Sequence, residues 1–313
     1  PSVCGEYVCQ QFKEVFTESI GLLRGYCHKI KLREGAKPIV HKVRPIPHLL
    51  YAPLEKEIQK LLDQKIIEPI DSSEWLSPIV ITHKAHSNDI RLCVDLRDLN
   101  ANIWVDRHPL PRIHEILTLI QDASLFTVLD LSSAYYQVEL EEASRHLTSF
   151  VTPVGAYRYR RMPFGLASAA AAFQRIMQHV LKGIPRTMCF QDDILLFGAN
   201  EKEHDATLEL VLHSLKKAGL TIKREKCQIG VGSVNYLGHT ISNQGIRPKL
   251  DLVEAIKSAP HPTSKEELKS FLGMAEFYAK FVKNFASITQ PLCQLLKKNV
   301  LFFLNKDCQG DVE

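Results

Sequence analysis

FQDDILLF (190–197) is the most informative segment of this sequence, because an acidic pair, Asp192 and Asp193, interrupts two apolar runs. Apolar runs separated by a short polar tip predict a β-hairpin with the pair at or beside its turn. Turns favour aspartate for conformational reasons alone, so an isolated pair is ordinarily turn chemistry. The segment by itself therefore allows both a structural and a functional interpretation.

A third carboxylate, Asp130, favours the functional interpretation. It lies within the apolar run VLDL (128–131), where a charge is costly unless it is paired or bound to a metal. If this strand lies beside the hairpin, the three carboxylates converge, and they then need cations to remain ionised together. Oxygen ligands select hard cations such as Mg²⁺. Two such ions about 3.5–4 Å apart stabilise the attacking and leaving oxygens of phosphoryl transfer. The spacing permits this convergence without showing it.

The remaining pattern predicts an α+β body followed by a helical appendage. Helical spacing of apolar residues and runs of β-branched residues set the expected elements. Helices are expected over 54–67, 167–181, 204–220 and 287–298, strands over 78–82, 90–94 and 125–131, and a hairpin over 187–197. Gly219 suits a helix C-terminal cap, and Ser264-x-x-Glu267 is typical of a capping box. Residues 1–247 thus mix strands and helices, whereas 248–300 is helical.

Composition excludes several classes of protein. The 313 residues are 45% hydrophobic and 24% charged, which is ordinary for a folded chain and unlike a disordered or collagen-like one. No apolar run is long enough for a membrane span, and no secretory signal is visible. The eight cysteines form no CxxC pair, so reduced thiols are expected rather than a zinc site. A net charge of +4 identifies no partner unless the basic residues cluster.

Five blocks in order resemble the reverse transcriptases of gypsy-class LTR retrotransposons and their retroviral relatives. They are LDLSSAYYQV (129–138), MPFGLASAAAAFQ (162–174), FQDDILLF (190–197), YLGHTIS (236–242) and SFLGMAEFYAKFVKNFA (270–286). SPIVITHKAHSNDIRLCVDLRDLN (77–100) is similar to the fingers hairpin of that family. The resemblance covers nearly the whole chain and implies a right-hand polymerase fold with fingers, palm and thumb.

The resemblance also implies subdomain boundaries. The expected segments are 1–104 (N-terminal extension and fingers), 105–139 (first part of the palm), 140–163 (second part of the fingers), 164–247 (second part of the palm), 248–300 (thumb) and 301–313 (start of the connection). The last segment is too short for an RNase H domain, so RNase H activity is not expected of these residues. The first residue is Pro1, and we expect a piece of a longer polyprotein that also carries protease, RNase H and integrase.

By this resemblance the chain is an RNA-directed DNA polymerase, a nucleotidyltransferase that copies RNA or DNA templates. Asp130, Asp192 and Asp193 would bind two Mg²⁺ ions, with Mn²⁺ as a substitute. The primer 3′-OH would attack the α-phosphorus of a dNTP. The expected partners are a template with an annealed primer, dNTPs and a second copy of the chain, with no membrane. The expected location is a cytoplasmic virus-like particle, and the nucleus during integration.

The resemblance assigns further residues to the nucleotide site. Those implied to bind dNTP are Lys84, Arg91, Leu131, Ser132, Ser133, Ala134, Tyr135 and Phe164. Lys84 and Arg91 would grip the triphosphate, since lysine and arginine suit phosphate oxygens. Tyr135 would lie under the sugar and exclude a 2′-OH. Without the resemblance, these residues are as well explained by surface charge and core packing.

Contacts to the primer and template are implied for another set: Gln191, Lys223, Arg224, Leu237 and Gly238. The two cations belong to a basic cluster that also contains Lys216, Lys217 and Lys226, and more lysines follow at 265, 269, 280 and 283. Contact with nucleic-acid phosphates is one interpretation of these charges. A solvated surface is the other.

Several positions depart from the family pattern. The family usually has Arg, Gly and His where Ser132, Ala134 and Tyr136 stand, Pro at Ala170 and Tyr at Phe190. These changes affect the surroundings of the carboxylates rather than the carboxylates themselves. A catalytically decayed remnant that binds nucleic acid, or a non-catalytic subunit of a dimer, therefore remains the alternative to an active polymerase.

Overall fold

The computed structural model describes residues 7–8, 10–83, 89–106, 108–109, 119–120, 122–131, 133–298, 300 and 302–303. Lys84, Ser132, the side chain of Lys280 and most of the predicted connection segment lie outside the described residues. The chain divides into two compact units, Pro1–Val231 and Gly232–Glu313. The division falls inside the predicted 164–247 segment, and the predicted subdomain boundaries stay predictions.

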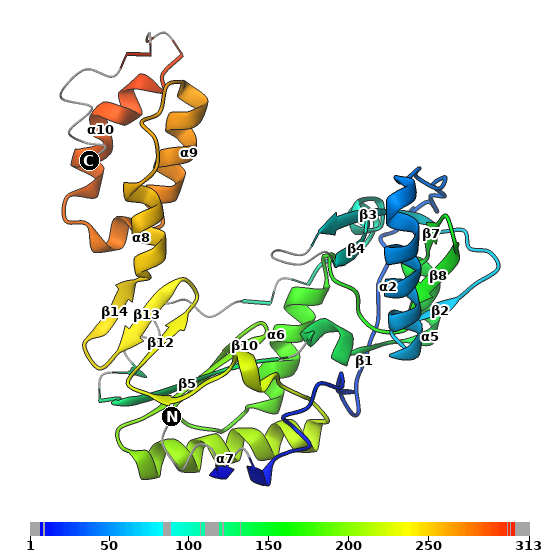
Figure 1. Ribbon diagram of the computed structural model, residues 1–313, viewed down its shortest axis with the longest axis horizontal. Helices are drawn as coiled ribbons and strands as arrows, with labels where there is room; N and C mark the ends of the chain where they lie inside the picture. Colours follow the sequence, from blue (N-terminus) through cyan, green and yellow to red (C-terminus); the bar gives the residue numbers. More distant parts are fainter. Residues whose placement is uncertain are drawn as a thin grey trace. The chain divides into compact units, whose positions relative to one another are not determined.

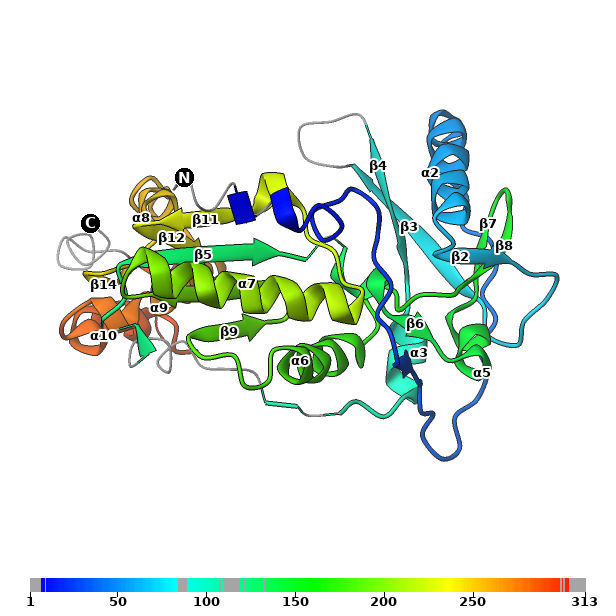
Figure 2. The ribbon, with the colours of Figure 1, turned by 90° about the horizontal axis from the view of Figure 1, so that it is seen from below.

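The first unit is built on a four-stranded antiparallel sheet in the order β11-β5-β10-β9. Its strands are β11 (Gln228–Val231), β5 (Leu125–Asp130), β10 (Asp193–Gly198) and β9 (Thr187–Phe190). Helices α6 (Ala169–Val180) and α7 (Glu201–Ala218) cover one face of this sheet (Figures 1 and 2). The hairpin predicted over 187–197 is therefore confirmed as β9–β10.

Helix α7 shows why the sequence forms these layers. The Asn200 side chain accepts a hydrogen bond from the Glu203 amide, and Gly219 ends the helix at a φ of 79°, where glycine carries no Cβ penalty. Fully buried apolar residues recur at helical spacing on its inner face: Leu208, Val211, Leu212 and Leu215. They share a core with Leu129 of β5 and Leu196 of β10.

A five-stranded sheet in the order β2-β8-β7-β3-β4 forms the other part of the first unit. Its strands are β2 (Ile67–Pro69), β8 (Gly155–Tyr159), β7 (Phe150–Thr152), β3 (Ser77–His83) and β4 (Ile90–Val94). The hairpin expected within residues 77–100 is confirmed, because β3 and β4 pair with Thr82 opposite Arg91. Accompanying elements are β1 (Cys27–His28), α2 (Tyr51–Asp63), α3 (Arg97–Asn102), β6 (Glu139–Leu140) and α5 (Glu142–Arg145).

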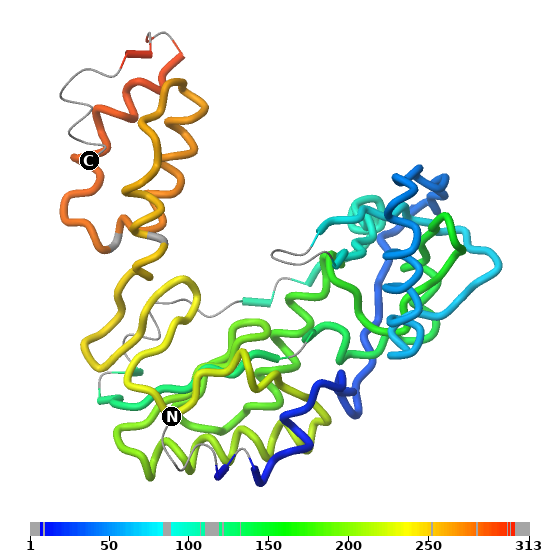
Figure 3. The backbone as a smooth tube through the Cα atoms, in the orientation of Figure 1, coloured from blue at the N-terminus to red at the C-terminus, as the bar shows by residue number. Residues whose placement is uncertain are grey.

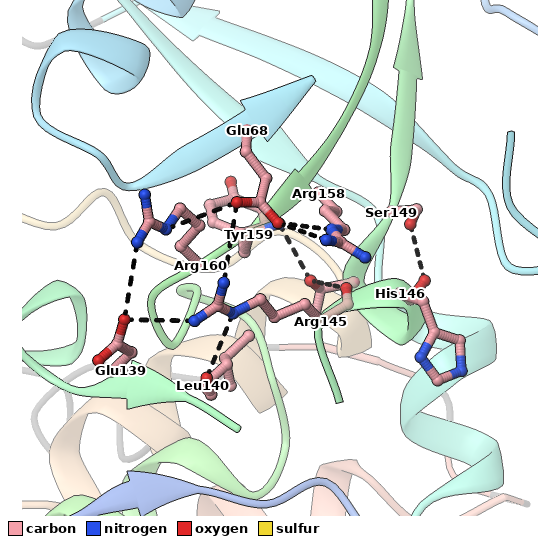
Figure 4. A network of polar contacts seen from close by, with 10 residues as sticks. Glu68, Glu139, Leu140, Arg145, His146, Ser149, Arg158, Tyr159 and Arg160 are labelled. Carbon is pink, nitrogen blue, oxygen red and sulfur yellow. Dashed lines mark hydrogen bonds and ion pairs between the residues drawn. The ribbon is translucent and has the colours of Figure 1, made fainter. Parts of the chain in front are cut away.

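A cluster of charged side chains ties β2, β6, α5 and the β8 region together (Figure 4). Glu68 of β2 lies 2.6 Å from Arg158 and 3.5 Å from Arg160. Arg145 lies 3.8 Å from Glu68 and 3.3 Å from Glu139, so it bridges the two carboxylates. The five side chains are largely shielded from water, which makes these pairs more effective than surface ion pairs.

The second unit consists of a small antiparallel sheet followed by helices (Figure 3). The strands are β12 (Ser233–Tyr236), β13 (His239–Ser242) and β14 (Gly245–Pro248), and the helices are α8 (Leu250–Lys257), α9 (Lys265–Glu276) and α10 (Phe285–Leu295). Ser264 caps α9 by accepting from the Glu267 amide at 3.2 Å, as predicted, while the Glu267 carboxylate accepts from the Thr263 amide at 2.7 Å. None of the helices within the described residues is both long and apolar enough to cross a membrane.

Candidate active site

Strands β5 and β10 bring the predicted carboxylates to one end of the four-stranded sheet. Asp130, the last residue of β5, is the register partner of Asp193, the first residue of β10. The Leu131 amide donates a hydrogen bond to the Asp192 carbonyl at 3.0 Å, which extends the pairing past the end of β5. Directly opposed residues of antiparallel strands lie about 4.5–5.5 Å apart. The adjacency that the sequence only permitted is therefore observed.

The alternation of side chains directs Asp130 and Asp193 away from the helices. Thr127 of β5 hydrogen-bonds through Oγ1 to Nε2 of His204 in α7 at 2.8 Å, so its side chain faces that helix. Residues of opposite parity, Asp130 among them, face the other side of the sheet. Asp193 shares that side because it pairs with Asp130. The acidic cluster therefore lies on the face that α6 and α7 leave uncovered.

The electrostatics of the cluster call for a cation. Burial raises the pKa of Asp193 to about 6, and the charges of Asp192 and Asp130 add to the effect. The pKa of Asp192 is raised as well, mainly by burial. Among the described residues, no three metal-binding side chains are arranged to hold an ion as they stand. Three partly buried carboxylates are nonetheless a donor set that suits a hard divalent cation.

Lys226 supplies positive charge at this site. It ends a short 3-10 helix, η4 (Arg224–Lys226), and its Nζ lies 3.3 Å from both carboxylate oxygens of Asp130. The backbone anchors the same segment, since the Lys223 amide donates to the Asp130 carbonyl at 3.2 Å. The sequence assigned this cluster to nucleic-acid phosphates or to solvent, and neither interpretation anticipated an ion pair with Asp130.

Gln174 is a positioning residue that sequence reasoning missed. It is fully buried in α6, and both ends of its amide bind the β9–β10 hairpin. Its Nε2 donates to the Cys189 carbonyl at 2.8 Å, and its Oε1 accepts from the Gln191 amide at 2.8 Å. Gln191 has a φ of 54°, which is uncommon for a residue other than glycine. Gln174 therefore holds the turn that presents Asp192 and Asp193.

Two aromatic residues of the predicted nucleotide site lie together beside the carboxylates. The rings of Tyr135 and Phe164 are 5.1 Å apart, and Phe173 of α6 lies 5.7 Å from Tyr135. Burial raises the pKa of Tyr135, and the negative charge of Asp192 adds to it. Phe164 is 47% exposed, so this aromatic surface is open to a ligand.

The remaining predicted residues occupy several places. Ala134 is buried in η2 (Ala134–Gln137), after Ser133 in a left-handed conformation. Leu131 follows Asp130, and its amide donates to the Asp192 carbonyl. Arg91 is exposed on β4. Leu237 and Gly238 lie in the second unit, at the β12–β13 turn, with φ values of 49° and 76°. Two positive φ values are typical of a tight hairpin turn.

Comparisons with known proteins identify the class to which this fold and site belong. Residues 82–241, slightly more than half of the chain, match the model of the family described as reverse transcriptase (RNA-dependent DNA polymerase). The Pol polyprotein of the Drosophila melanogaster transposon 412 is 33% identical to this chain over 97% of the chain's residues. That of the Drosophila melanogaster transposon gypsy is 36% identical over 78% of the chain's residues. The chain belongs to the reverse transcriptase family, as a domain of the kind found in retrotransposon Pol polyproteins.

Solved structures agree on the fold. A foamy viral protease–reverse transcriptase (dRH) in complex with double-stranded DNA superimposes with a TM-score of 0.89, at 22% identity, over 98% of this chain and 54% of that one. The foamy viral protease–reverse transcriptase in complex with an RNA/DNA hybrid superimposes with a TM-score of 0.84. The expected right-hand polymerase fold is thus confirmed. The chain spans about a quarter of the length of the 412 and gypsy polyproteins.

The clamp formed by Gln174 predicts the behaviour of one backbone amide. Gln174→Leu leaves the Gln191 amide and the Cys189 carbonyl without their partner, so hydrogen exchange at Gln191 should accelerate by about tenfold or more, on the basis of about 1–3 kcal/mol for a lost buried partner. Gln178→Leu, on the exposed side of the same helix, is the matched control. Equal exchange at Gln191 in both variants would contradict the clamp.

The raised pKa of Asp193 predicts a pH-dependent stability. The folded state binds this proton more tightly than the unfolded state, so ionisation of Asp193 destabilises the fold above pH 6 and has no effect below about pH 4. In EDTA, Asp193→Asn should therefore raise the melting temperature at pH 7–8, and the gain should vanish towards pH 4. Asp71→Asn, at an exposed position, is the control. A gain that is independent of pH would show that ionisation of Asp193 is not its cause.

Proposed function

We propose that this domain extends the 3′-OH of a primer with dNTPs, copying RNA or DNA templates. The observation that carries the proposal is the β5–β10 register, which pairs Asp130 with Asp193 and ties Asp192 to Leu131. Asp130, Asp192 and Asp193 would hold two divalent ions, Mg²⁺ in the first place and Mn²⁺ as a substitute. When bound, the ions would supply the positive charge that stabilises the attacking and leaving oxygens.

The chain's own residues prepare this site in two ways. Gln174 fixes the turn, so that Asp192 and Asp193 keep their positions without the cost of ordering them at each turnover. Lys226 offsets part of the negative charge of the carboxylates through contacts to both oxygens of Asp130. Lys226 would give up these oxygens when Asp130 holds a cation, because the side chain of Lys226 is exposed and can move into solvent.

The nucleotide would lie against Tyr135 and Phe164, with Lys84 and Arg91 at the triphosphate. Tyr135 lies close enough to Asp192 to feel its charge, which supports this placement because an aromatic ring then lies beside the carboxylates. The Tyr135 ring contacts the rings of Phe164 and Phe173, and these contacts would hold it in place against a 2′-hydroxyl. This arrangement supports a preference for deoxyribonucleotides.

The proposed macromolecular partners are a template with an annealed primer, a second copy of this chain, and the protease, RNase H and integrase modules of a parent polyprotein. Gln191, Lys223, Arg224, Leu237 and Gly238 are proposed to contact the primer or template. Support comes from the similar foamy viral proteins, whose structures contain double-stranded DNA or an RNA/DNA hybrid. The proposed location is a cytoplasmic virus-like particle, with passage into the nucleus at integration.

A second candidate function is a nucleic-acid-binding subunit or remnant without catalysis. The ion pair between Lys226 and Asp130 favours it, because a lysine already satisfies one carboxylate of the cluster. The buried methyl group of Ala134 and the missing hydroxyl at Phe190 are in keeping with a drifting environment around intact carboxylates.

Primer extension separates the two functions. Purified protein should extend oligo(dT) on poly(rA) with Mg²⁺, and Asp192→Asn should reduce the rate by at least about a hundredfold, because a partly buried electrostatic group is lost. Asp71→Asn is the control and should extend normally. Folded wild-type protein that binds the template–primer but adds no nucleotide would exclude the polymerase in favour of the second candidate.

Sugar selection tests the assignment of Tyr135. Tyr135→Val removes the ring that lies beside the sugar position, so incorporation of ribonucleotides relative to deoxyribonucleotides should rise about tenfold or more. Tyr135→Phe keeps the ring and should keep the selection. If both variants discriminate like the wild type, another group excludes the 2′-hydroxyl.

A further inference from the structure

A basic hollow of about 690 Å³ lies in the first unit, between the N-terminal segment and helices α6 and α7. Its basic lining residues are Arg24, Arg175, His179, Lys182 and Lys217, and no carboxylate is among the described residues that line it. Figure 2 shows the N-terminal segment, in blue, passing the end of α7 on its way to β1. The hollow therefore lies on the helix-covered side of the sheet, whereas Asp130 and Asp193 face the other side.

The fold fixes the wall of this hollow through backbone hydrogen bonds. The Leu22 amide donates to the Gly219 carbonyl, and the Arg24 amide donates to the Ala218 carbonyl, both at 2.9 Å. A Cβ at Gly219 would lie 2.3 Å from the Leu22 carbonyl oxygen, so only glycine permits this approach. Arg24 is thereby held against the last turn of α7, which also carries Lys217.

Most cations of the hollow are poorly neutralised within the protein, although Arg175 forms an ion pair with Asp106. Within the described part of the chain, Arg24, Lys182 and Lys217 form no ion pair with a carboxylate, whereas neighbouring Lys216 pairs with Glu14. Helix dipoles favour basic residues at the ends of α6 and α7. They do not account for Arg24, which comes from an irregular segment. Convergent cations without counter-charges repel one another unless an anion lies between them.

A second hollow of about 830 Å³ adjoins the first and shares Tyr26 and Arg175 with it. It adds Lys29, Lys31, Asp106, which pairs with Arg175, and Trp104, which is 64% exposed. Trp104 is anchored by its amide, which donates to the Lys31 carbonyl at 2.8 Å. The two hollows together are much larger than a phosphate ion, and they combine cations with the exposed ring of Trp104.

We propose that these joined hollows bind single-stranded nucleic acid, with phosphates against Arg24, Lys182 and Lys217 and a base stacked on Trp104. Basic grooves interleaved with aromatic rings bind single strands in this way, because charge holds the backbone and every base has a face that can stack. The site is separate from the acidic cluster and does not depend on polymerase activity. The chain thus has a second nucleic-acid site behind its catalytic sheet.

Binding of fluorescein-labelled (dT)20 tests this proposal, measured by anisotropy with the full chain saturated by unlabelled template–primer duplex. Arg24→Gln/Lys182→Gln/Lys217→Gln should weaken binding by at least tenfold. It should also reduce the slope of log K against log salt by about two, since each phosphate contact on a single strand contributes about 0.7. Trp104→Ala should weaken binding about tenfold while leaving the slope unchanged.

Matched substitutions complete the experiment. Lys56→Gln/Lys60→Gln/Lys202→Gln removes the same charge from exposed positions elsewhere in the first unit and should bind (dT)20 like the wild type. Extension of a primer annealed to a template with a short 5′ overhang should be unchanged in the Arg24/Lys182/Lys217 variant, so failure here is distinguishable from failure of the polymerase. Equal affinity and slope in the two triple variants would overturn the site. Binding of pyrophosphate, measured by calorimetry, without any binding of (dT)20 would overturn the nucleic-acid site in favour of a small-anion site.

Discussion

The antiparallel register between β5 and β10 is the constraint on which the rest of this structure depends. It sets Asp130 opposite Asp193 at the end of both strands, and a shift by one residue would turn one of the two carboxylates into the helix-packed core. The register is maintained by the apolar residues of the same strands, since Leu129, Ile194 and Leu196 are fully buried under α6 and α7. The packing that stabilises the sheet thus also determines the geometry of the acidic cluster.

The cluster carries an electrostatic cost that the surrounding structure offsets. Burial and mutual repulsion raise the pKa of Asp192 and Asp193, and Lys226 works against this from a neighbouring segment. Gln174 of α6 stabilises the hairpin turn, in which Gln191 has an unfavourable φ, by accepting a hydrogen bond from the Gln191 amide. Strained or repulsive arrangements of this kind persist where the surroundings over-determine them, and they gather at functional sites.

Much of this arrangement was predictable from the sequence, for identifiable reasons. Apolar runs and the position of the acidic residues indicated β5 and the β9–β10 hairpin, and the capping pattern at Ser264 located α9. Gln174 was not predictable as a clamp, because a polar residue in an amphipathic helix is ordinarily solvated. The attachment of Arg24 to the end of α7 was missed because irregular chain has no periodicity to follow. Lys226 was recognised as a cation, but its partner lies 96 residues earlier in the sequence.

The most direct test of the central claim is the binding of Mn²⁺ followed by electron paramagnetic resonance. The complex would contain a dideoxy-terminated primer, its template and the next dNTP. If the β5–β10 register builds one cation site from Asp130, Asp192 and Asp193, the wild type should bind two Mn²⁺ ions close enough to couple magnetically, and Asp130→Asn should lose the coupling. Folded wild-type protein that binds the template–primer but no coupled pair of ions would contradict the account.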